Sequence, residues 1–306
     1  MQYIRNLYNS GGKCKKRLLM NKKVVAHKLC SGITGAAGIF ILFCVFVYFL
    51  QDSMVFYSVR DHASREFLQD RQGFYEVVFT SENGKTYHGM MYQADDKKAP
   101  LVIYFGGNGE VSYRNMRMRE ANNQWPYFPG YSYLFVDYEG YGLNGGRTHY
   151  LNMYEQSLAA FDYAVSLANV DSNRIVAMGF SLGTGSAVHL AANRPIAGLI
   201  LAAPYANGYD LYNNVVPVFF GPLRLLVRQK LPSDEHAPFV NSPVLIIASR
   251  RDEIIPFSSS QRLSKLFSGN VEFMVLDNAL HNDIFQTDGV LNRVRSFLEL
   301  IVRADL

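Results

Sequence analysis

This 306-residue chain has no cysteine after residue 50 and no acidic residue before residue 51. All three cysteines, Cys14, Cys30 and Cys44, lie in the first fifty residues. The body after residue 50 therefore has no thiol for a disulfide, a zinc cluster or a cysteine nucleophile. The first fifty residues contain eight Lys or Arg and no Asp or Glu, which leaves the body 22 basic and 26 acidic residues. This slightly negative balance excludes a strongly basic, nucleic-acid-binding body.

Polar residues are scarce in the segment 29–50, where 22 residues carry no charge. As a helix this segment would be about 33 Å long, against about 30 Å for the hydrocarbon core of a bilayer. A buried core helix usually keeps a polar stripe, and this segment has none. A cleavable signal peptide is the main alternative, but its apolar run is usually no longer than about 15 residues, and no A-x-A-like site precedes Gln51. We therefore predict an uncleaved transmembrane anchor at 29–50.

The charges around this segment predict its orientation. Eight basic residues precede the apolar segment. By the positive-inside rule, this basic N-terminal stretch lies in the cytoplasm. We expect a basic cytoplasmic segment at 1–28, the anchor at 29–50, a connector at 51–74 and a folded domain at 75–306. The domain would lie on the opposite side of the membrane, which is periplasmic, lumenal or extracellular.

The folded domain alternates apolar runs with helical patterns. A hairpin is expected at 76–80 and 85–93, because a turn sequence separates two strand-like runs. Unalternated apolar runs indicate strands that are buried on both faces; they lie at 101–105, 131–137, 174–180, 197–203, 243–249 and 271–277. Helical patterns follow at 153–168, 181–192, 258–267 and 290–302. The alternation predicts an α/β fold with a mostly parallel central sheet and helices on both faces.

Ser181 stands in a G-x-S-x-G motif between Gly179 and Gly183. The motif directly follows the strand 174–180 and directly precedes a helical pattern rich in small residues. Such a strand-to-helix turn holds its serine in a strained conformation, and glycines on both sides leave room for it. Ser181 is therefore the candidate nucleophile.

A serine hydroxyl needs a base to remove its proton, and that base is usually a histidine oriented by a carboxylate. In this architecture the chain order is serine, then the acid, then histidine, each after a later strand. Asp252 follows the strand 243–249, and His281 follows the strand 271–277. The alternative candidates for the acid are Glu253, Asp277 and Asp283. For the base, we set aside His149 and His236 because we expect them in solvated loops.

Acyl transfer also needs N–H donors for the oxyanion that develops on the substrate. The backbone N–H of Leu182 is one candidate, and that of Asn108 is the other, in the glycine-rich loop 106–109 after a strand. Glycine-rich loops also bind phosphates, but no P-loop lysine and no Gly-x-Gly-x-x-Gly spacing occurs here. We predict neither a cofactor nor a metal.

The motifs taken together resemble the α/β-hydrolase superfamily over about residues 75–303. They are Gly106-Gly107-Asn108-Gly109, Asp137-Tyr138-Glu139-Gly140-Tyr141-Gly142, Gly179-Phe180-Ser181-Leu182-Gly183, Asp252-Glu253-Ile254-Ile255-Pro256 and Leu280-His281-Asn282-Asp283. More narrowly, they are similar to its membrane-anchored serine hydrolases, which include acyl-protein thioesterases and lysophospholipases.

The resemblance implies an α/β-hydrolase fold with Ser181 as nucleophile, Asp252 as acid and His281 as base. It also implies an oxyanion hole formed by the backbones of Asn108 and Leu182. The chain departs from these relatives at a few positions: Gly106 replaces a histidine, Glu139 and Asn144 replace an arginine and a serine, and Arg250 and Arg251 replace a glycine-containing turn.

About forty residues, 204–240, separate two predicted strands, and they form either a cap over the site or helices packed on the sheet. We expect a membrane-anchored serine hydrolase that acts on a lipid-like ester or thioester, with the lipid bilayer as its other partner. A peptidase or amidase with the same triad is one alternative. A non-catalytic binding protein on the same fold is another, because fold alone does not establish catalysis.

Overall fold

The computed structural model describes residues 27–303 except 29–30, 50, 53–54, 61–65, 67–71, 95–97, 122–127, 129, 216 and 218. The chain divides into two compact units, residues 1–50 and residues 51–306. The first unit contains the helix Ser31–Phe49, which has a mean hydropathy of 2.2 and is long and apolar enough to cross a membrane. A signal sequence near an N-terminus has the same properties.

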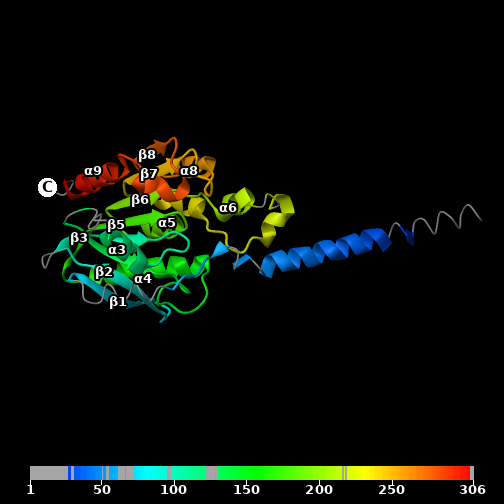
Figure 1. The fold of residues 1–306 in the computed structure, drawn as a ribbon, viewed down its shortest axis with the longest axis horizontal. Coiled ribbons are helices and arrows are strands. Elements are labelled where there is room, and N and C mark those ends of the chain that lie inside the picture. The colour runs from blue at the N-terminus through cyan, green and yellow to red at the C-terminus, as the bar shows by residue number, and fades with distance from the viewer. Residues whose placement is uncertain are drawn as a thin grey trace, which may run out of the picture. The chain divides into compact units, whose positions relative to one another are not determined.

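The second unit is built on an eight-stranded sheet with the order β1-β2-β4-β3-β5-β6-β7-β8 (Figure 1). The antiparallel hairpin of β1 and β2 joins β4 antiparallel, and all later neighbours pair in parallel. The strands are β1 (Phe74–Thr80), β2 (Thr86–Tyr92), β3 (Ala99–Phe105), β4 (Ser132–Val136), β5 (Val170–Phe180), β6 (Gly198–Ala202), β7 (Val244–Ser249) and β8 (Val271–Leu276). The predicted hairpin and mostly parallel sheet are confirmed.

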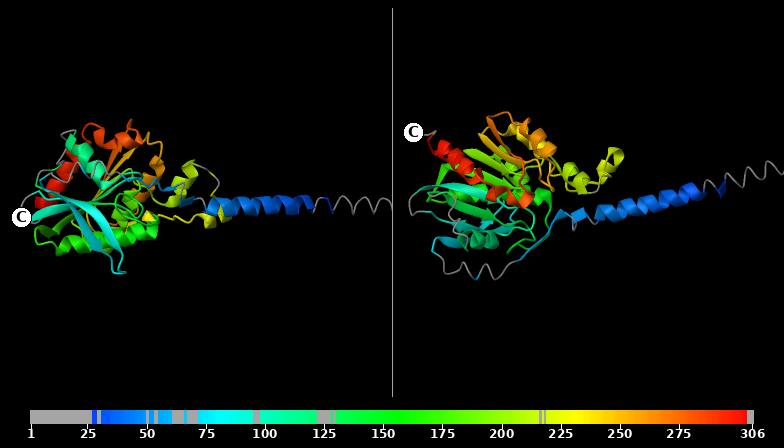
Figure 2. Two further views of the ribbon diagram at one scale, coloured as in Figure 1. Left: turned by 60° about the horizontal axis from the view of Figure 1, so that its bottom comes forward. Right: turned by 45° about the horizontal axis from the view of Figure 1, so that its top comes forward.

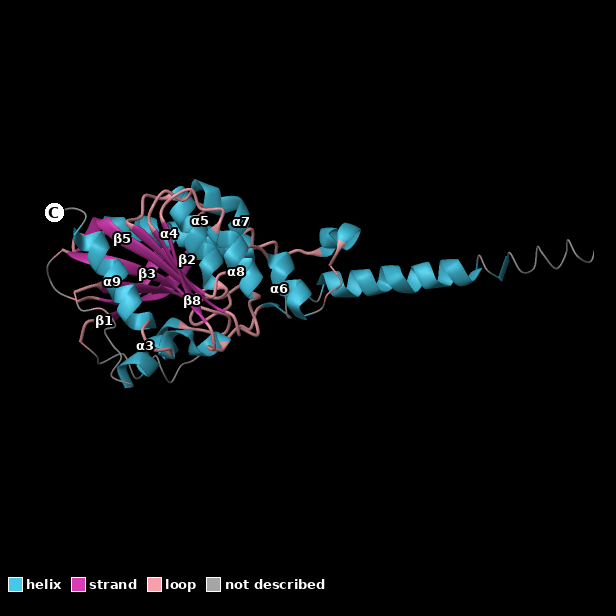
Figure 3. Cartoon of the chain, turned by 90° about the horizontal axis from the view of Figure 1, so that it is seen from above, coloured by secondary structure: helices cyan, strands magenta, loops and turns pink. Residues whose placement is uncertain are grey.

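Helices cover both faces of the sheet (Figure 3). The helices α4, α5 and α7 lie on one face, and α3 and α9 lie on the other. The helical segments are α3 (Ser112–Ala121), α4 (Tyr150–Ser166), α5 (Gly183–Asn193), α6 (Gly208–Val215), η1 (Gly221–Leu226), α7 (Ser233–His236), η2 (Ala237–Phe239), α8 (Phe257–Ser264), η3 (His281–Gln286) and α9 (Val290–Arg303). This is the predicted α/β-hydrolase fold.

The core lies on both faces of the central strands. Every residue of β3, β4, β6 and β7 is buried, as unalternated apolar runs predict. In β8 only Leu276 is buried, because this strand lies at the edge of the sheet. The carboxyl ends of β3, β5, β7 and β8 carry the loops in which the sequence places its candidate site residues.

Candidate active site

Ser181 lies in a sharp turn between β5 and α5, and its φ of +49° is in the left-handed region. Such a conformation costs a non-glycine residue on the order of 1–3 kcal/mol and needs support from its surroundings. Here Ser181 N donates to the carbonyl of Ala202 at 2.9 Å. A Cβ on Gly183 would lie 2.0 Å from the carbonyl oxygen of Phe105, so only glycine fits there. The motif therefore forms the turn that its sequence predicts.

The structure brings together the three side chains that the sequence singles out. Ser181 Oγ lies 2.8 Å from His281 Nε2, and His281 Nδ1 lies 2.9 Å and 2.8 Å from Oδ1 and Oδ2 of Asp252. The side chains of His281 and Asp252 are only 4% and 2% exposed. In this geometry a histidine can take a proton from the serine while the carboxylate holds the ring.

The loop after β7 fixes the carboxylate of Asp252. Its Oδ1 accepts the backbone N–H groups of Ile254 at 2.9 Å and Ile255 at 2.8 Å. The carboxylate of Glu253 accepts the backbone N–H of His281 at 3.0 Å. Glu253 therefore anchors the histidine loop, a contact that sequence reasoning missed because it joins two separate loops.

The other carboxylate rivals lie elsewhere. Asp277 forms an exposed ion pair with Arg250 at 3.1 Å, and Arg250 also lies over the ring of Phe257. Asp283 lies in the first turn of η3. Among the residues that the structure describes, Asp252 is the carboxylate within hydrogen-bonding distance of the His281 ring.

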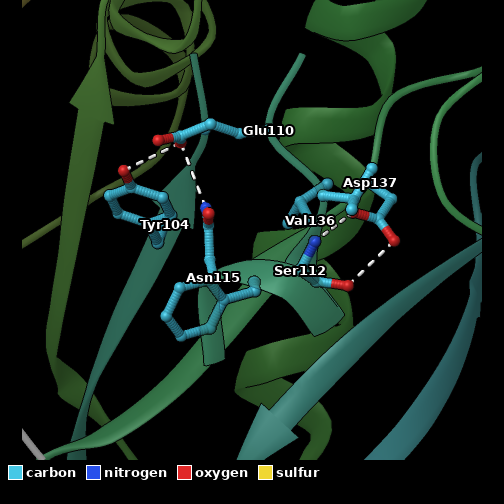
Figure 4. Close-up of a pocket in the computed structure, with 9 residues that line it drawn as sticks. Tyr104, Glu110, Ser112, Asn115, Val136 and Asp137 are labelled. Carbon is cyan, nitrogen blue, oxygen red and sulfur yellow. Dashed lines mark hydrogen bonds between the residues drawn. The ribbon is translucent and has the colours of Figure 1, made fainter. Parts of the chain in front are cut away.

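The loop between β3 and α3 passes directly beside the serine. A Cβ on Gly107 would lie 2.9 Å from the Phe180 ring and 3.5 Å from Ser181 Cβ. Gly107 N donates to Glu110 at 2.9 Å. The same carboxylate accepts the Tyr104 hydroxyl and the Asn115 amide, each at 3.1 Å (Figure 4). Glu110 therefore fixes the start of the loop that holds Asn108.

The side chain of Asn108 is tied to the segment that follows residue 51. Its Oδ1 accepts the N–H of Tyr57 at 2.8 Å and the hydroxyl of Tyr141 at 2.7 Å, and its Nδ2 donates to the carbonyl of Val55 at 2.7 Å. Within the described part of the chain, the backbone N–H groups of Asn108 and Leu182 have no hydrogen-bond acceptor. Leu182 also lies at the N-terminus of α5, where N–H groups point out of the helix.

Asp137 fixes the start of α3, directly after the same loop (Figure 4). Its buried carboxylate accepts the N–H and the hydroxyl of Ser112 at 2.7 Å and 2.8 Å. Burial raises the pKa of Asp137 to about 6, although both hydrogen bonds from Ser112 act in the opposite direction. The small pocket beside it is lined by these mutually bonded side chains, so it is part of the loop's support.

Two histidines differ from their predicted setting. We expected His149 and His236 in solvated loops, but both are half-buried. His149 caps α4 by accepting the N–H of Leu151 at 3.2 Å. His236 Nε2 lies 3.3 Å from Nδ1 of His189, whose ring stacks on Tyr154 with a centroid distance of 4.4 Å. Burial, which is the larger cause, and the neighbouring His236 lower the pKa of His189 to about 3; burial also lowers the pKa of His236.

The comparisons with known proteins agree with this fold. The model of the dienelactone hydrolase family matches residues 147–282. An uncharacterized protein of Mycobacterium tuberculosis is 32% identical over 226 residues, which cover 73% of this chain and 78% of that protein. The α/β-hydrolase domain-containing protein aho-3 of Caenorhabditis elegans is 32% identical over 164 residues. These residues cover 54% of this chain and 48% of that protein, so the match spans about half of each.

Among solved structures, an esterase of Pyrococcus furiosus superimposes with a TM-score of 0.63 at 19% identity, covering 80% of this chain and 96% of that chain. At this identity the likeness concerns the fold. The chain belongs to the α/β-hydrolase superfamily. Within that superfamily it is a hydrolase. No group of three or more His, Cys, Asp or Glu that could hold a metal ion occurs among the described residues.

Proposed function

We propose that this protein is a membrane-anchored serine hydrolase that cleaves carboxylic esters through an acyl-enzyme on Ser181. The observation that carries the proposal is the 2.8 Å distance between Ser181 Oγ and His281 Nε2, in a ring held by Asp252. The strained turn at Ser181 adds support, because strained backbone conformations are concentrated at functional sites.

In the first half of the reaction, Ser181 Oγ attacks the ester carbonyl carbon while its proton moves to His281 Nε2. The oxyanion of the tetrahedral intermediate accepts the backbone N–H groups of Leu182 and Asn108. In comparable enzymes each such donor contributes about 2.7–4 kcal/mol to the transition state. The carbon–oxygen bond then breaks, and the alcohol leaves with the proton from His281.

In the second half, a water molecule gives a proton to His281 Nε2 and attacks the acyl carbonyl carbon. The intermediate collapses, the carboxylic acid leaves, and Ser181 Oγ takes the proton back. The carboxylate of Asp252 holds and stabilises the positively charged ring in both halves. A thioester would follow the same steps with a thiol as the leaving group.

Hydrolysis of p-nitrophenyl esters from acetate to decanoate by the full chain in detergent tests this proposal. We expect activity with the wild type and a loss of at least about 10³-fold for Ser181→Ala. Ser186→Ala is the matched control, since it removes the hydroxyl of a buried serine in α5. Equal activity of Ser181→Ala and the wild type would contradict the assignment.

We further propose that residues 29–50 anchor the chain, with 1–28 in the cytoplasm, 51–74 as a connector and the hydrolase domain 75–306 on the opposite side. Support comes from the apolar helix Ser31–Phe49 and from the eight basic residues that precede it. A membrane-impermeant maleimide applied to bacterial spheroplasts tests this topology in a Cys30→Ser, Cys44→Ser background. Cys14 should stay unlabelled and an exposed Gln261→Cys should be labelled; the reverse pattern would refute it.

A further inference from the structure

Residues 204–240, for which the sequence predicts either a cap or helices packed on the sheet, are called the cap here; they expose large apolar side chains at one tip. Leu225 in η1 is 87% exposed, and Phe220, directly before η1, is 60% exposed. Gly221 follows Phe220 with a φ of +53°, so the chain turns sharply at this tip. Exposed apolar surface of this kind is a feature of sites that bind proteins or membranes.

The charged side chains within residues 211–233 all have one sign, and a carboxylate paired with them, Asp52, comes from the start of the second unit. From residue 211 to residue 233 the sequence contains three basic residues, Arg224, Arg228 and Lys230, and no Asp or Glu. Arg224 and Lys230 are exposed, and the guanidinium of Arg224 lies 4.2 Å from the ring centroid of Tyr209. Apolar side chains beside basic ones are typical of surfaces that lie in the headgroup region of a bilayer.

The tip is fastened to the start of the second unit. Gln51 Nε2 donates to the carbonyl of Leu226 at 2.6 Å, and Gln51 Oε1 accepts the N–H of Arg228 at 2.9 Å. Asp52 accepts the amide of Gln229 at 2.6 Å and pairs with Arg228 at 3.1 Å. Gln51 is 1% exposed. The cap is therefore tied to the two residues that directly follow the apolar run 29–50.

From these contacts we infer that the tip formed by Phe220 and Leu225 docks on the lipid surface from which the chain emerges. The inference rests on the proposed anchor, because an anchor at 29–50 puts Gln51 at the membrane boundary. Leu225 directly precedes Leu226, which is bonded to Gln51, so its side chain lies within reach of the lipid. The exposed Arg224 and Lys230 would contact anionic headgroups.

The experiment uses the full chain in lipid nanodiscs that hold one copy each, with Cys14, Cys30 and Cys44 replaced by Ser. An environment-sensitive fluorophore is attached at Leu225→Cys. The matched control is Leu300→Cys, because Leu300 is also apolar and 61% exposed. Leu300 lies on α9, which is at the opposite end of this unit from α6 of the cap (Figures 1 and 2).

We expect a blue-shifted emission at position 225 and several-fold stronger quenching there by brominated lipids than at position 300. Charge reversal at Arg224 and Lys230 should weaken this quenching in anionic discs. Equal, weak quenching at both positions overturns the inference. A fluorophore at position 225 that is quenched neither by aqueous iodide nor by brominated lipid also overturns the inference, because protein rather than lipid then covers the tip. Failure of the chain to enter discs refutes the anchor itself, a result distinct from loss of esterase activity.

Discussion

Replacement of Asp252 by asparagine tests how the histidine is activated. In the structure Oδ1 of Asp252 accepts the N–H groups of Ile254 and Ile255. In the Asp252→Asn variant the amide oxygen would keep this position, since only an oxygen can accept those two donors. The amide nitrogen would then take the place of Oδ2, which lies 2.8 Å from His281 Nδ1.

That exchange reverses the tautomer of the histidine. The amide nitrogen, at the shorter of the two distances from Nδ1, donates to it and favours the tautomer that carries its proton on Nε2, which faces Ser181 Oγ at 2.8 Å. A protonated Nε2 cannot remove the serine proton. We therefore expect kcat to fall by about 10⁴-fold, or about 5.5 kcal/mol, with KM nearly unchanged because the Asp252 side chain is only 2% exposed.

The assay is steady-state hydrolysis of p-nitrophenyl acetate by the full chain, with circular dichroism to verify the fold. Asp277→Asn is the matched control: it removes the same charge from an exposed ion pair and should leave kcat unchanged. If Asp252→Asn keeps more than about a tenth of the wild-type kcat, the carboxylate does not orient the base and the reasoning fails.

Three further predictions concern the scaffold of the site. Asn108→Ala removes three side-chain hydrogen bonds that hold the loop 106–109, which we propose supplies an oxyanion donor, so kcat should fall by about 10- to 100-fold in the ester assay while far-UV dichroism stays unchanged. Burial raises the pKa of Asp137 from 3.8 to about 6, so its ionisation costs the folded state on the order of 1–3 kcal/mol at pH 7.5, and this cost vanishes as the pH falls towards 4. Asp137→Asn should therefore raise Tm at pH 7.5 and have little effect at pH 4.5; a constant difference in scanning calorimetry would refute this. Gly183→Ala places a Cβ 2.0 Å from the Phe105 carbonyl, so it should destabilise the fold by several kcal/mol in urea unfolding, and an unchanged midpoint would contradict the tight turn.

The fold was predictable where burial produces a clear sequence pattern. Strands such as β3 and β7 are buried throughout, so their apolar runs are uninterrupted. The helix Ser112–Ala121 was not predicted, because its sequence SYRNMRMREA has no apolar stripe. The strand β5 begins at Val170, four residues before the predicted apolar run. Val170 pairs with Ala99, and the register then shifts so that Ile175 pairs with Leu101. The start of β5 was missed because the polar residues 171–174 between these pairs interrupt the apolar pattern.

The geometry at Ser181, Asp252 and His281 follows from chain order, since each residue comes directly after a strand of one parallel sheet. The supports of the site could not be predicted in the same way. Asn108 is bonded to the backbone of Val55 and Tyr57, about fifty residues earlier, and these backbone groups leave no signal in the side-chain pattern. The contact of Glu253 with the backbone of His281 likewise depends on how two loops approach.

Labelling with a fluorophosphonate probe tests the central claim most directly, because the probe reacts with a serine hydroxyl only where a base has activated it. The full chain in detergent is treated with the probe, and the modified peptide is identified by mass spectrometry. We expect one modified residue, Ser181, and no labelling of Ser181→Ala or His281→Ala. A folded wild-type protein that stays unlabelled, or a Ser181→Ala variant that labels as well as the wild type, would contradict it.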